Sequence, residues 1–282
     1  MTKTWLITGA SSGFGRGMAE RLLARGDQVI ATVRRQGSLD DLAAQYHDRL
    51  RVVYLDVTDT DGVQAAVNQA FADFKRIDVI VSNAGYGILG TVEETSIDQM
   101  RDIIETNLMG SMFLIKAALP HLRAQGFGRI VQVSSEGGQI AYPGFSLYHA
   151  SKWGIEGFIE SLAKEVQPFD IDFMIVEPGP SRTAFVGSIV LPDPISDYDG
   201  TPAHDLKDAA FGGGWVIKGD PDRMVDAMIT AADAPVMPFR LLLGKDAYAG
   251  VHGALSERLA VLEAGRDVTE AADFTEEELA AM

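Results

Sequence analysis

The sequence contains no cysteine, which excludes disulfide bridges, thiolate metal sites and a thiol nucleophile. It also lacks any run near the roughly 18 apolar residues of a membrane span, so we expect no transmembrane helix. Positive charge is scarce, because 24 Lys and Arg face 40 Asp and Glu for a formal net charge of −16. Such a surface repels phosphate backbones and anionic lipid, so we predict neither a nucleic-acid nor a membrane partner.

The first eight residues show no charged head followed by a long apolar core, the pattern of a secretion signal. The absence of cysteine also fits a reducing compartment, and we predict a soluble, cytoplasmic protein. Hydrophobic residues make up 46% of the chain and charged residues 23%, which excludes wholesale disorder. A chain of 282 residues is long enough to bury a core without cross-links.

Short apolar runs alternate with helix-length amphipathic segments. The strand-like runs are residues 5–8, 29–33, 51–55, 79–82, 129–134, 172–176 and 240–243. The helical patterns are residues 14–25, 39–46, 61–75, 97–124, 148–166 and 221–232. This alternation predicts an α/β fold, a Rossmann-like doubly wound parallel sheet with helices on both faces. We expect a single domain over residues 1–282.

Residues 184–215 interrupt the alternation with three prolines and the triplet Gly212-Gly213-Gly214. A long irregular insertion in a compact fold is typically a lid or a disordered segment. We predict a substrate lid here, with a plain mobile loop as the alternative. Beyond the seventh strand, residues 246–264 predict an amphipathic helix, the first part of a C-terminal helical extension at 246–282.

The first strand runs into a glycine-rich turn, and a helical pattern follows. Glycines let the backbone turn sharply and let a diphosphate approach it, and a helix N-terminus offers free N–H groups. We therefore predict phosphate contacts from Gly9, Ser11, Ser12, Gly13, Phe14 and Gly15. A literal G-x-G-x-x-G lies at 85–90, but one dinucleotide needs one such turn, and the first strand is its usual place.

Tyr148 and Lys152 are four residues apart on a predicted helix, so they share a face. Free tyrosine has a pKa near 10, and a neighbouring ammonium group lowers it. A tyrosine tuned in this way can exchange a proton with a carbonyl or alcohol oxygen. Ser135 ends the fifth strand and would hold that oxygen, with Ser134 as the alternative. The alternative interpretation is that Tyr148 and Lys152 are an ordinary pair on a helix surface without a catalytic role.

In order along the chain, these motifs resemble the short-chain dehydrogenase/reductase family. The matching residues are Thr8-Gly9-x-x-x-Gly13-x-Gly15, Asp56-Val57, Asn83-Ala84-Gly85, Asn107, Ser135, Tyr148-x-x-x-Lys152, Pro178-Gly179 and Thr183. They span roughly residues 4–183, and the glycine spacing resembles the shorter, reductase-type branch. The resemblance implies hydride transfer between a nicotinamide cofactor and a carbonyl/alcohol pair of a small molecule.

The resemblance also implies a role for each motif. It assigns catalysis to Asn107, Ser135, Tyr148 and Lys152, with Asn107 positioning Lys152 through water. It assigns adenine contacts to Asp56 and Val57, ribose contacts to Asn83, Ala84 and Gly85, nicotinamide contacts to Pro178, Gly179 and Thr183, and cofactor contacts also to Tyr148 and Lys152. Family members are often dimers or tetramers through helices like 97–124 and 148–166. The chain past 245 departs from the shorter members, so homodimer and homotetramer both stay open.

The end of the second strand bears on the cofactor. A carboxylate there binds the ribose 2′-OH of NAD and repels the 2′-phosphate of NADP. This sequence has Val33 at that place, followed by Arg34 and Arg35, and a guanidinium can hold a phosphate in a fork. We therefore predict NADP(H) rather than NAD(H). The alternative is that both arginines only solvate a loop.

Other features point to no separate site. The five histidines show no metal-ligand spacing, so we predict no metal, and we interpret His149 as structural. Phe145, Phe185 and Trp215 are candidate apolar walls, which favours a hydrophobic ketone. Two other functions stay open: a cofactor-occupied sensor or scaffold with little turnover, and an NAD-dependent alcohol dehydrogenase.

Overall fold

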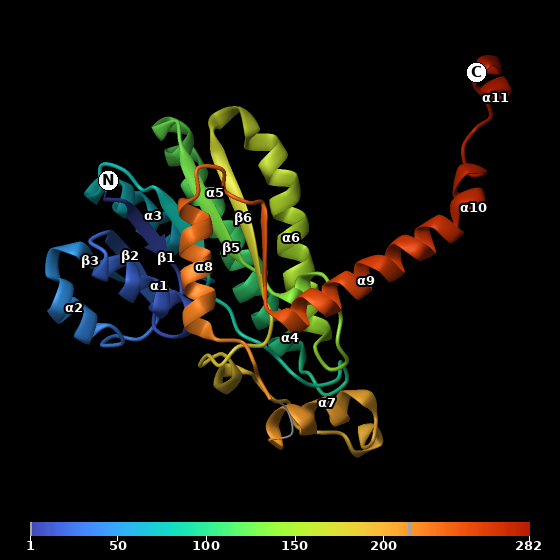
Figure 1. Cartoon of the computed structure of the whole chain (residues 1–282), viewed down its shortest axis with the longest axis horizontal. Coiled ribbons are helices and arrows are strands. Elements are labelled where there is room, and N and C mark those ends of the chain that lie inside the picture. Colours follow the sequence, from blue (N-terminus) through green and yellow to red (C-terminus); the bar gives the residue numbers. More distant parts are fainter. Residues whose placement is uncertain (1, 214–215) are drawn as a thin grey trace.

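The computed structural model describes residues 2–213 and 216–282. Its centre is a seven-stranded parallel sheet in the order β3-β2-β1-β4-β5-β6-β7 (Figure 1). The strands are β1 (Thr4–Ile7), β2 (Gln28–Val33), β3 (Leu50–Tyr54), β4 (Val79–Ser82), β5 (Gly128–Val133), β6 (Ile171–Pro178) and β7 (Arg240–Leu243). The predicted Rossmann-like α/β fold is confirmed.

Helices cover both faces of the sheet. The helices of the described chain are α1 (Gly13–Ala24), α2 (Asp40–Tyr46), α3 (Thr60–Asp73), α4 (Ile97–Ile104), α5 (Gly110–Gln125), α6 (Ser146–Val166), α7 (Pro202–Phe211), α8 (Pro221–Asp233), α9 (Lys245–Ala264), α10 (Arg266–Glu270) and α11 (Glu276–Ala281). Helices α1, α2 and α8 pack in one core cluster, and α3, α5 and α6 pack in the other. The site therefore rests on a rigid three-layer scaffold.

The two core clusters follow from the period of a strand. Successive side chains point to opposite faces, so Ile7 joins the cluster under α1 while Leu6 joins the cluster under α5 and α6. Both are buried, and a strand covered on both faces needs apolar residues at every position. This explains the continuous apolar runs of β1 and β4, which pair at the middle of the sheet.

The sheet order places a crevice between β1 and β4. From β1 the chain moves through α1 to β2 on one side, whereas β4 continues the sheet on the other side. In open α/β sheets, ligands bind outside the carboxyl ends of the strands at such a switch point. The glycine-rich turn after β1 and Asn83 after β4 both lie there.

The helical run predicted over 97–124 is not one regular helix. It divides into α4 and α5, joined by a π-helical turn over Glu105–Met109. A π turn holds one extra residue, so the side chains on either side change their direction relative to the helix axis. Asn107 lies inside this turn.

Residues 184–213, the described part of the predicted lid, hold more regular structure than their composition predicts. They contain α7, and Val190 forms a bridge with Ile88 after β4. Of these residues, Phe185, Val186, Ser188, Ile189, Ala210 and Phe211 line the main cavity. Trp215, predicted as an apolar wall, lies outside the described residues.

The C-terminal part leaves the body of the molecule (Figure 1). The predicted helix at 246–264 matches α9, which buries only Ala247 and Val251. Neither α10 nor α11 buries a side chain. This part of the chain therefore contributes little to the core.

Candidate active site

The turn after β1 needs glycine at three positions. Gly9 and Gly13 have φ angles of +66° and +54°, in the left-handed region that favours glycine. A Cβ at Gly15 would lie 2.5 Å from the Gly9 carbonyl oxygen, so α1 can begin this close to the turn only without a side chain there. The result is an open backbone loop at the start of a helix, which fits a dinucleotide diphosphate.

Asn83 at the end of β4 fixes this turn. Its Nδ2 donates to the carbonyl oxygens of Thr8 at 2.9 Å and Gly9 at 3.2 Å. In return, the Thr8 hydroxyl accepts from the backbone N–H groups of Asn83 at 3.0 Å and Ala84 at 3.1 Å. The predicted ribose-binding residues therefore also hold the phosphate-binding turn in shape.

The second glycine pattern, at 85–90, has a different role. A Cβ at Gly87 would meet Phe185 and Ile189, and a Cβ at Gly90 would lie 2.9 Å from Pro192. These glycines make room for the 184–192 segment, which pairs with this stretch through the backbone of Val190. The literal motif is therefore a packing feature.

Arg34 and Arg35 lie exposed at the rim of the cavity. Arg16, Arg21 and Arg25 each bind an aspartate, whereas Arg34 and Arg35 have no ion-pair partner in the described part of the chain. In a chain with a net charge of −16, two guanidinium groups left without carboxylates form a local positive site.

Several predicted cofactor residues lie outside the cavity lining. Gly15 lies beneath the turn, and Val57 packs where a Cβ at Gly110 would be. Asp56 accepts from the Thr58 hydroxyl at 2.8 Å; burial acts to raise its pKa, but Thr58 and the charge of Arg34 lower it. The lining does include Ser11, Ser12, Gly13, Phe14, Pro178, Gly179 and Thr183.

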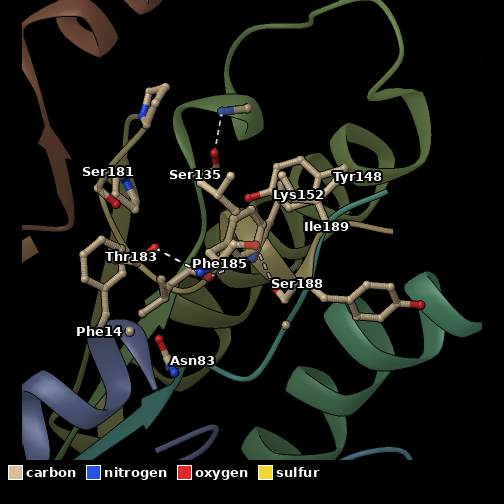
Figure 2. A pocket seen from close by; sticks show the side chains of 18 of the residues that line it. Phe14, Asn83, Ser135, Tyr148, Lys152, Ser181, Thr183, Phe185, Ser188 and Ile189 are labelled. Carbon is tan, nitrogen blue, oxygen red and sulfur yellow. Dashed lines mark hydrogen bonds between the residues drawn. The ribbon is translucent and has the colours of Figure 1, made fainter. Parts of the chain in front are cut away.

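Ser135 and Tyr148 face each other across the cavity (Figure 2). Ser135 follows β5, and its Oγ accepts from the Gly137 backbone at 3.0 Å. Tyr148 lies in the first turn of α6, and its hydroxyl points toward Ser135 (Figure 2). Two hydroxyls aimed at one point can hold a single substrate oxygen.

The pKa of Tyr148 departs from the expectation. Burial raises it to about 12, and the neighbouring Ser135 hydroxyl offsets only part of this. Lys152 Nζ donates to the Val133 carbonyl at 3.1 Å and lies 5.7 Å from the Tyr148 ring centre. The net pKa is therefore raised and not lowered as predicted, because burial of the phenol is the largest effect on it. Burial also lowers the pKa of Lys152 to about 8.

Asn107 reaches the site from the π turn. Its Oδ1 accepts from the Tyr86 backbone at 3.0 Å, and its Nδ2 donates to the Tyr86 carbonyl at 2.8 Å and to Ser151 Oγ at 3.2 Å. A Cβ at Gly85 would lie 3.0 Å from Asn107 Oδ1 and 3.9 Å from Lys152 Nζ, so both side chains flank Gly85. The water link from Asn107 to Lys152 stays a prediction.

The cavity has a volume of about 390 Å³. Its apolar walls include Leu89, Phe145, Phe185, Ile189 and Phe211. The rings of Phe145 and Phe185 each lie 5.9 Å from the Tyr148 ring. Both His149 ring nitrogens bind backbone groups, of Tyr142 and of Gly137, at 2.8 Å. His149 is thus held in place, in agreement with a structural role.

Two buried carboxyl groups at the site were given no chemical role from the sequence, although residues 135–139 were expected to shape the substrate pocket. Glu156 accepts from Ser134 Oγ at 2.5 Å and from Arg240 at 2.7 Å, and it lies one helical turn beyond Lys152. Glu136 directly follows Ser135 and lines the cavity. The four-residue spacing from Tyr148 through Lys152 to Glu156 is a signal that could have found the first.

A family model described as short chain dehydrogenase matches residues 3–192. The chain belongs to this family. It is 40% identical over 254 residues to the oxidoreductase BOA17 of Botryotinia fuckeliana, covering 89% of this chain and 92% of that protein. It is 37% identical over 208 residues to human 17-beta-hydroxysteroid dehydrogenase type 1, covering 71% of this chain and 62% of that protein.

Solved structures agree with the family assignment. A short-chain dehydrogenase from Streptomyces avermitilis superposes with a TM-score of 0.89 at 39% identity, covering 96% of this chain and 98% of that chain. A short chain dehydrogenase from Burkholderia cenocepacia in complex with NADP gives a TM-score of 0.72 at 25% identity, covering 92% and 95%. This short-chain dehydrogenase is therefore an NAD(P)-dependent oxidoreductase acting on CH–OH groups.

Two features of the described residues bear on other classes of site. No helix among them is long and apolar enough to cross a membrane. They hold no cluster of three or more side chains suited to a metal ion.

Proposed function

We propose that the protein is an NADP(H)-dependent enzyme that interconverts a ketone and an alcohol, with Tyr148 as the acid and base. The observation that carries this proposal is that the Ser135 and Tyr148 side chains lie near each other on the lining of the cavity that the glycine turn also lines. The cofactor and the reacting oxygen would share this one space.

The glycine turn and the start of α1 would hold the cofactor diphosphate, because they line the cavity and a helix N-terminus offers free N–H groups. Asn83, Ala84 and Gly85 would face the ribose, and Pro178, Gly179 and Thr183 would face the nicotinamide. When bound, the nicotinamide supplies or accepts the hydride. Arg34 and Arg35 support the choice of NADP(H). Neither forms an ion pair in the described part of the chain, so both guanidinium groups are free to bind the 2′-phosphate of NADP.

Tyr148 would give its proton to the oxygen of a ketone and take it back from an alcohol. Its pKa of about 12 keeps the phenol protonated at neutral pH, which suits the direction of reduction. Ser135 would orient the oxygen beside Tyr148. Lys152 would place a positive charge behind the phenol and stabilise it while the proton leaves.

The 184–215 segment would serve as the substrate lid, because six of its residues line the cavity. Its phenylalanines, with Leu89 and Phe145, make walls that suit a hydrophobic ketone. The relative named 17-beta-hydroxysteroid dehydrogenase type 1 is in keeping with an apolar substrate.

The test is the oxidation of NADPH and, in parallel, NADH, with a panel of apolar ketones. We expect turnover with NADPH, and a loss of at least about 100-fold in kcat for Tyr148→Phe. Tyr248→Phe, on the exposed side of α9, is the matched control and should keep full activity. Binding of NADPH without turnover of any ketone would reject the proposal in favour of a sensor, and a preference for NADH would reject the cofactor assignment.

A further inference from the structure

Glu136 is a carboxyl group on the lining of the cavity, where its described neighbours carry no carboxyl group. It is 5% exposed and follows Ser135 directly. It is the one carboxylic acid among the described residues that line the cavity. Neither hydride transfer nor the proton transfer by Tyr148 makes use of it.

One oxygen of Glu136 has a protein partner. Oε1 accepts from the Tyr142 hydroxyl at 3.3 Å. Oε2 has no hydrogen bond in the described part of the chain, yet it is not among the sealed, unpartnered atoms, which are Thr91 Oγ1, Arg129 Nε and Gln132 Oε1. Oε2 therefore keeps accessible surface, and the space that Glu136 lines is the cavity. A Cβ at Gly179 would lie 3.5 Å from Oε2, which places this oxygen beside the predicted nicotinamide contacts.

The neighbouring groups that act on Glu136 do not neutralise the negative charge of its carboxylate. Tyr142 and Tyr148 are neutral neighbours, and Asp246 at the start of α9 is a second acid, itself bound by Lys218 at 2.8 Å. Burial, with the charge of Asp246, raises the pKa of Glu136 to about 7 despite the bond from Tyr142. A buried carboxyl without a cation costs stability, so its place here calls for a function.

The other polar groups on this side of the cavity are already in use. Both nitrogens of His149 bind the backbone, and the Ser188 hydroxyl donates to the Phe185 carbonyl at 2.8 Å. Ser135 and Tyr148 take the reacting oxygen under the proposed function. Glu136 Oε2 is thus an acceptor left for a second polar group of the substrate.

We propose that Glu136 is a substrate-recognition residue that accepts a hydrogen bond from a hydroxyl group next to the reacting carbonyl of an otherwise apolar ketone. This inference rests on the proposed function, because it takes the carbonyl to lie at Ser135 and Tyr148. A hydroxyl fits better than an ammonium group, because it can pair with the neutral as well as the ionised carboxyl, and burial disfavours the ionised form. The preferred substrate class is then the hydroxyketone, or in the other direction the diol.

The test compares two ketones that differ by one group. A naphthyl hydroxymethyl ketone and the naphthyl ethyl ketone, with methyl in place of hydroxyl, are titrated into the NADP⁺-loaded enzyme, and both Kd values are measured. We expect the wild type to bind the hydroxyketone at least about tenfold more tightly, the usual worth of one buried hydrogen bond. Glu136→Leu should bring the ratio of the two Kd values to about one.

The matched control is Asp246→Asn, which removes the neighbouring acid without touching the cavity, and it should keep the hydroxyketone preference. A wild-type ratio near one, or a ratio that survives Glu136→Leu, would overturn the inference. The carbonyl cannot be reduced by NADP⁺, so the titration does not depend on ketone reduction. A preserved hydroxyketone preference in a protein that never oxidises NADPH would count against the proposed function alone.

Stability gives a second readout. The pKa of Glu136 is raised above its ordinary value of 4.5, so its ionisation destabilises the fold as the pH rises through about 7. Glu136→Gln cannot ionise, and its gain in Tm over the wild type should grow between about pH 5 and pH 8. An equal difference at both pH values would show that the carboxyl is already compensated, and would remove the argument that it is kept for a ligand.

Discussion

Lys152 carries its charge in a nearly closed environment. It is 6% exposed, and its one hydrogen bond is to the Val133 carbonyl. Burial lowers its pKa to about 8, while the negative charge of Glu156 acts the other way. The positive field behind Tyr148 is therefore present at neutral pH and lost just above it.

This gives a prediction for the pH dependence of ketone reduction. Tyr148, with a pKa of about 12, stays protonated throughout, so the proton itself is always available. Lys152 loses its charge as the pH rises through about 8, and kcat should fall there. A pH–rate profile of NADPH oxidation checks this. In Lys152→Met the fall near pH 8 should be absent and kcat lower at every pH; a mutant that keeps the fall would assign it to another group.

Gly15 tests the cofactor turn. Its missing side chain leaves room for the Gly9 carbonyl and for Asn83, which a Cβ would approach to 2.5 and 2.6 Å. Gly15→Ala should push the turn open and raise the Kd for NADPH at least about tenfold. Gly157→Ala is the matched control, because α6 leaves open space around Gly157 and alanine favours a helix by roughly 1 kcal/mol. Equal NADPH affinity in both variants would show that the turn does not bind the cofactor.

Helix α7 is attached to the body by a buried acid. Glu94 accepts from the backbone of Thr91 at 2.7 Å and of Ile195 at 2.9 Å, and contacts His204 of α7 at 2.6 Å. Burial acts to raise the pKa of Glu94, but these hydrogen bonds lower it to about 2. The carboxylate is therefore ionised at any physiological pH and holds the 193–204 region against the loop after β4.

Removing this attachment should affect substrate binding more than chemistry. His204→Ala leaves Glu94 without its α7 partner, so we expect faster amide exchange in α7 and a several-fold higher KM for the ketone. The kcat should change by less than about twofold. His252→Ala, on exposed α9, is the control. An unchanged exchange rate in α7 would show that other contacts hold it.

The strands and helices were largely predictable because their signals are local. The apolar run of β4 and the periodicity of α6 need no distant partner to be recognised. Helix α7 was missed because the prolines and glycines of 184–215 resemble a loop, while its anchor, Glu94, lies 110 residues from His204. The π turn at Asn107 was missed because one extra residue barely changes a helical pattern.

At the site, too, the features with a local sequence signal were predictable and those that depend on the folded surroundings were not. Ser135, Tyr148 and Lys152 were found by spacing, because a strand end and one helix face bring them together. The raised pKa of Tyr148 could not be foreseen, since it depends mainly on how deeply the folded chain buries the phenol. Glu136 gave no signal of its own, because a glutamate after a serine is common and only its burial sets it apart.

The C-terminal helices differ in how closely they pack against the body of the molecule. Ala247 packs where a Cβ at Gly179 would be, so the start of α9 belongs to the site's support. The parts beyond it, α10 and α11, bury nothing. A chain ending at Gly265 should therefore keep its kcat and its Tm to within about 2 °C, whereas a chain ending at Gly244 should lose several degrees. Thermal unfolding of both truncated chains checks this; a large loss in the longer one would reveal a role for the tail.

The strand order of the sheet also bears on the order in which the strands can pair during synthesis. Each strand after β1 in the described chain pairs with a strand made before it, β2 and β4 with β1, β3 with β2, and β5 to β7 each with its predecessor. During synthesis the sheet can therefore grow by adding to an existing edge. The diphosphate turn is complete once β4 has emerged, whereas Ser135, Tyr148 and the Phe185 wall arrive later. We expect a nascent chain on the ribosome to be able to hold its cofactor well before it can use it.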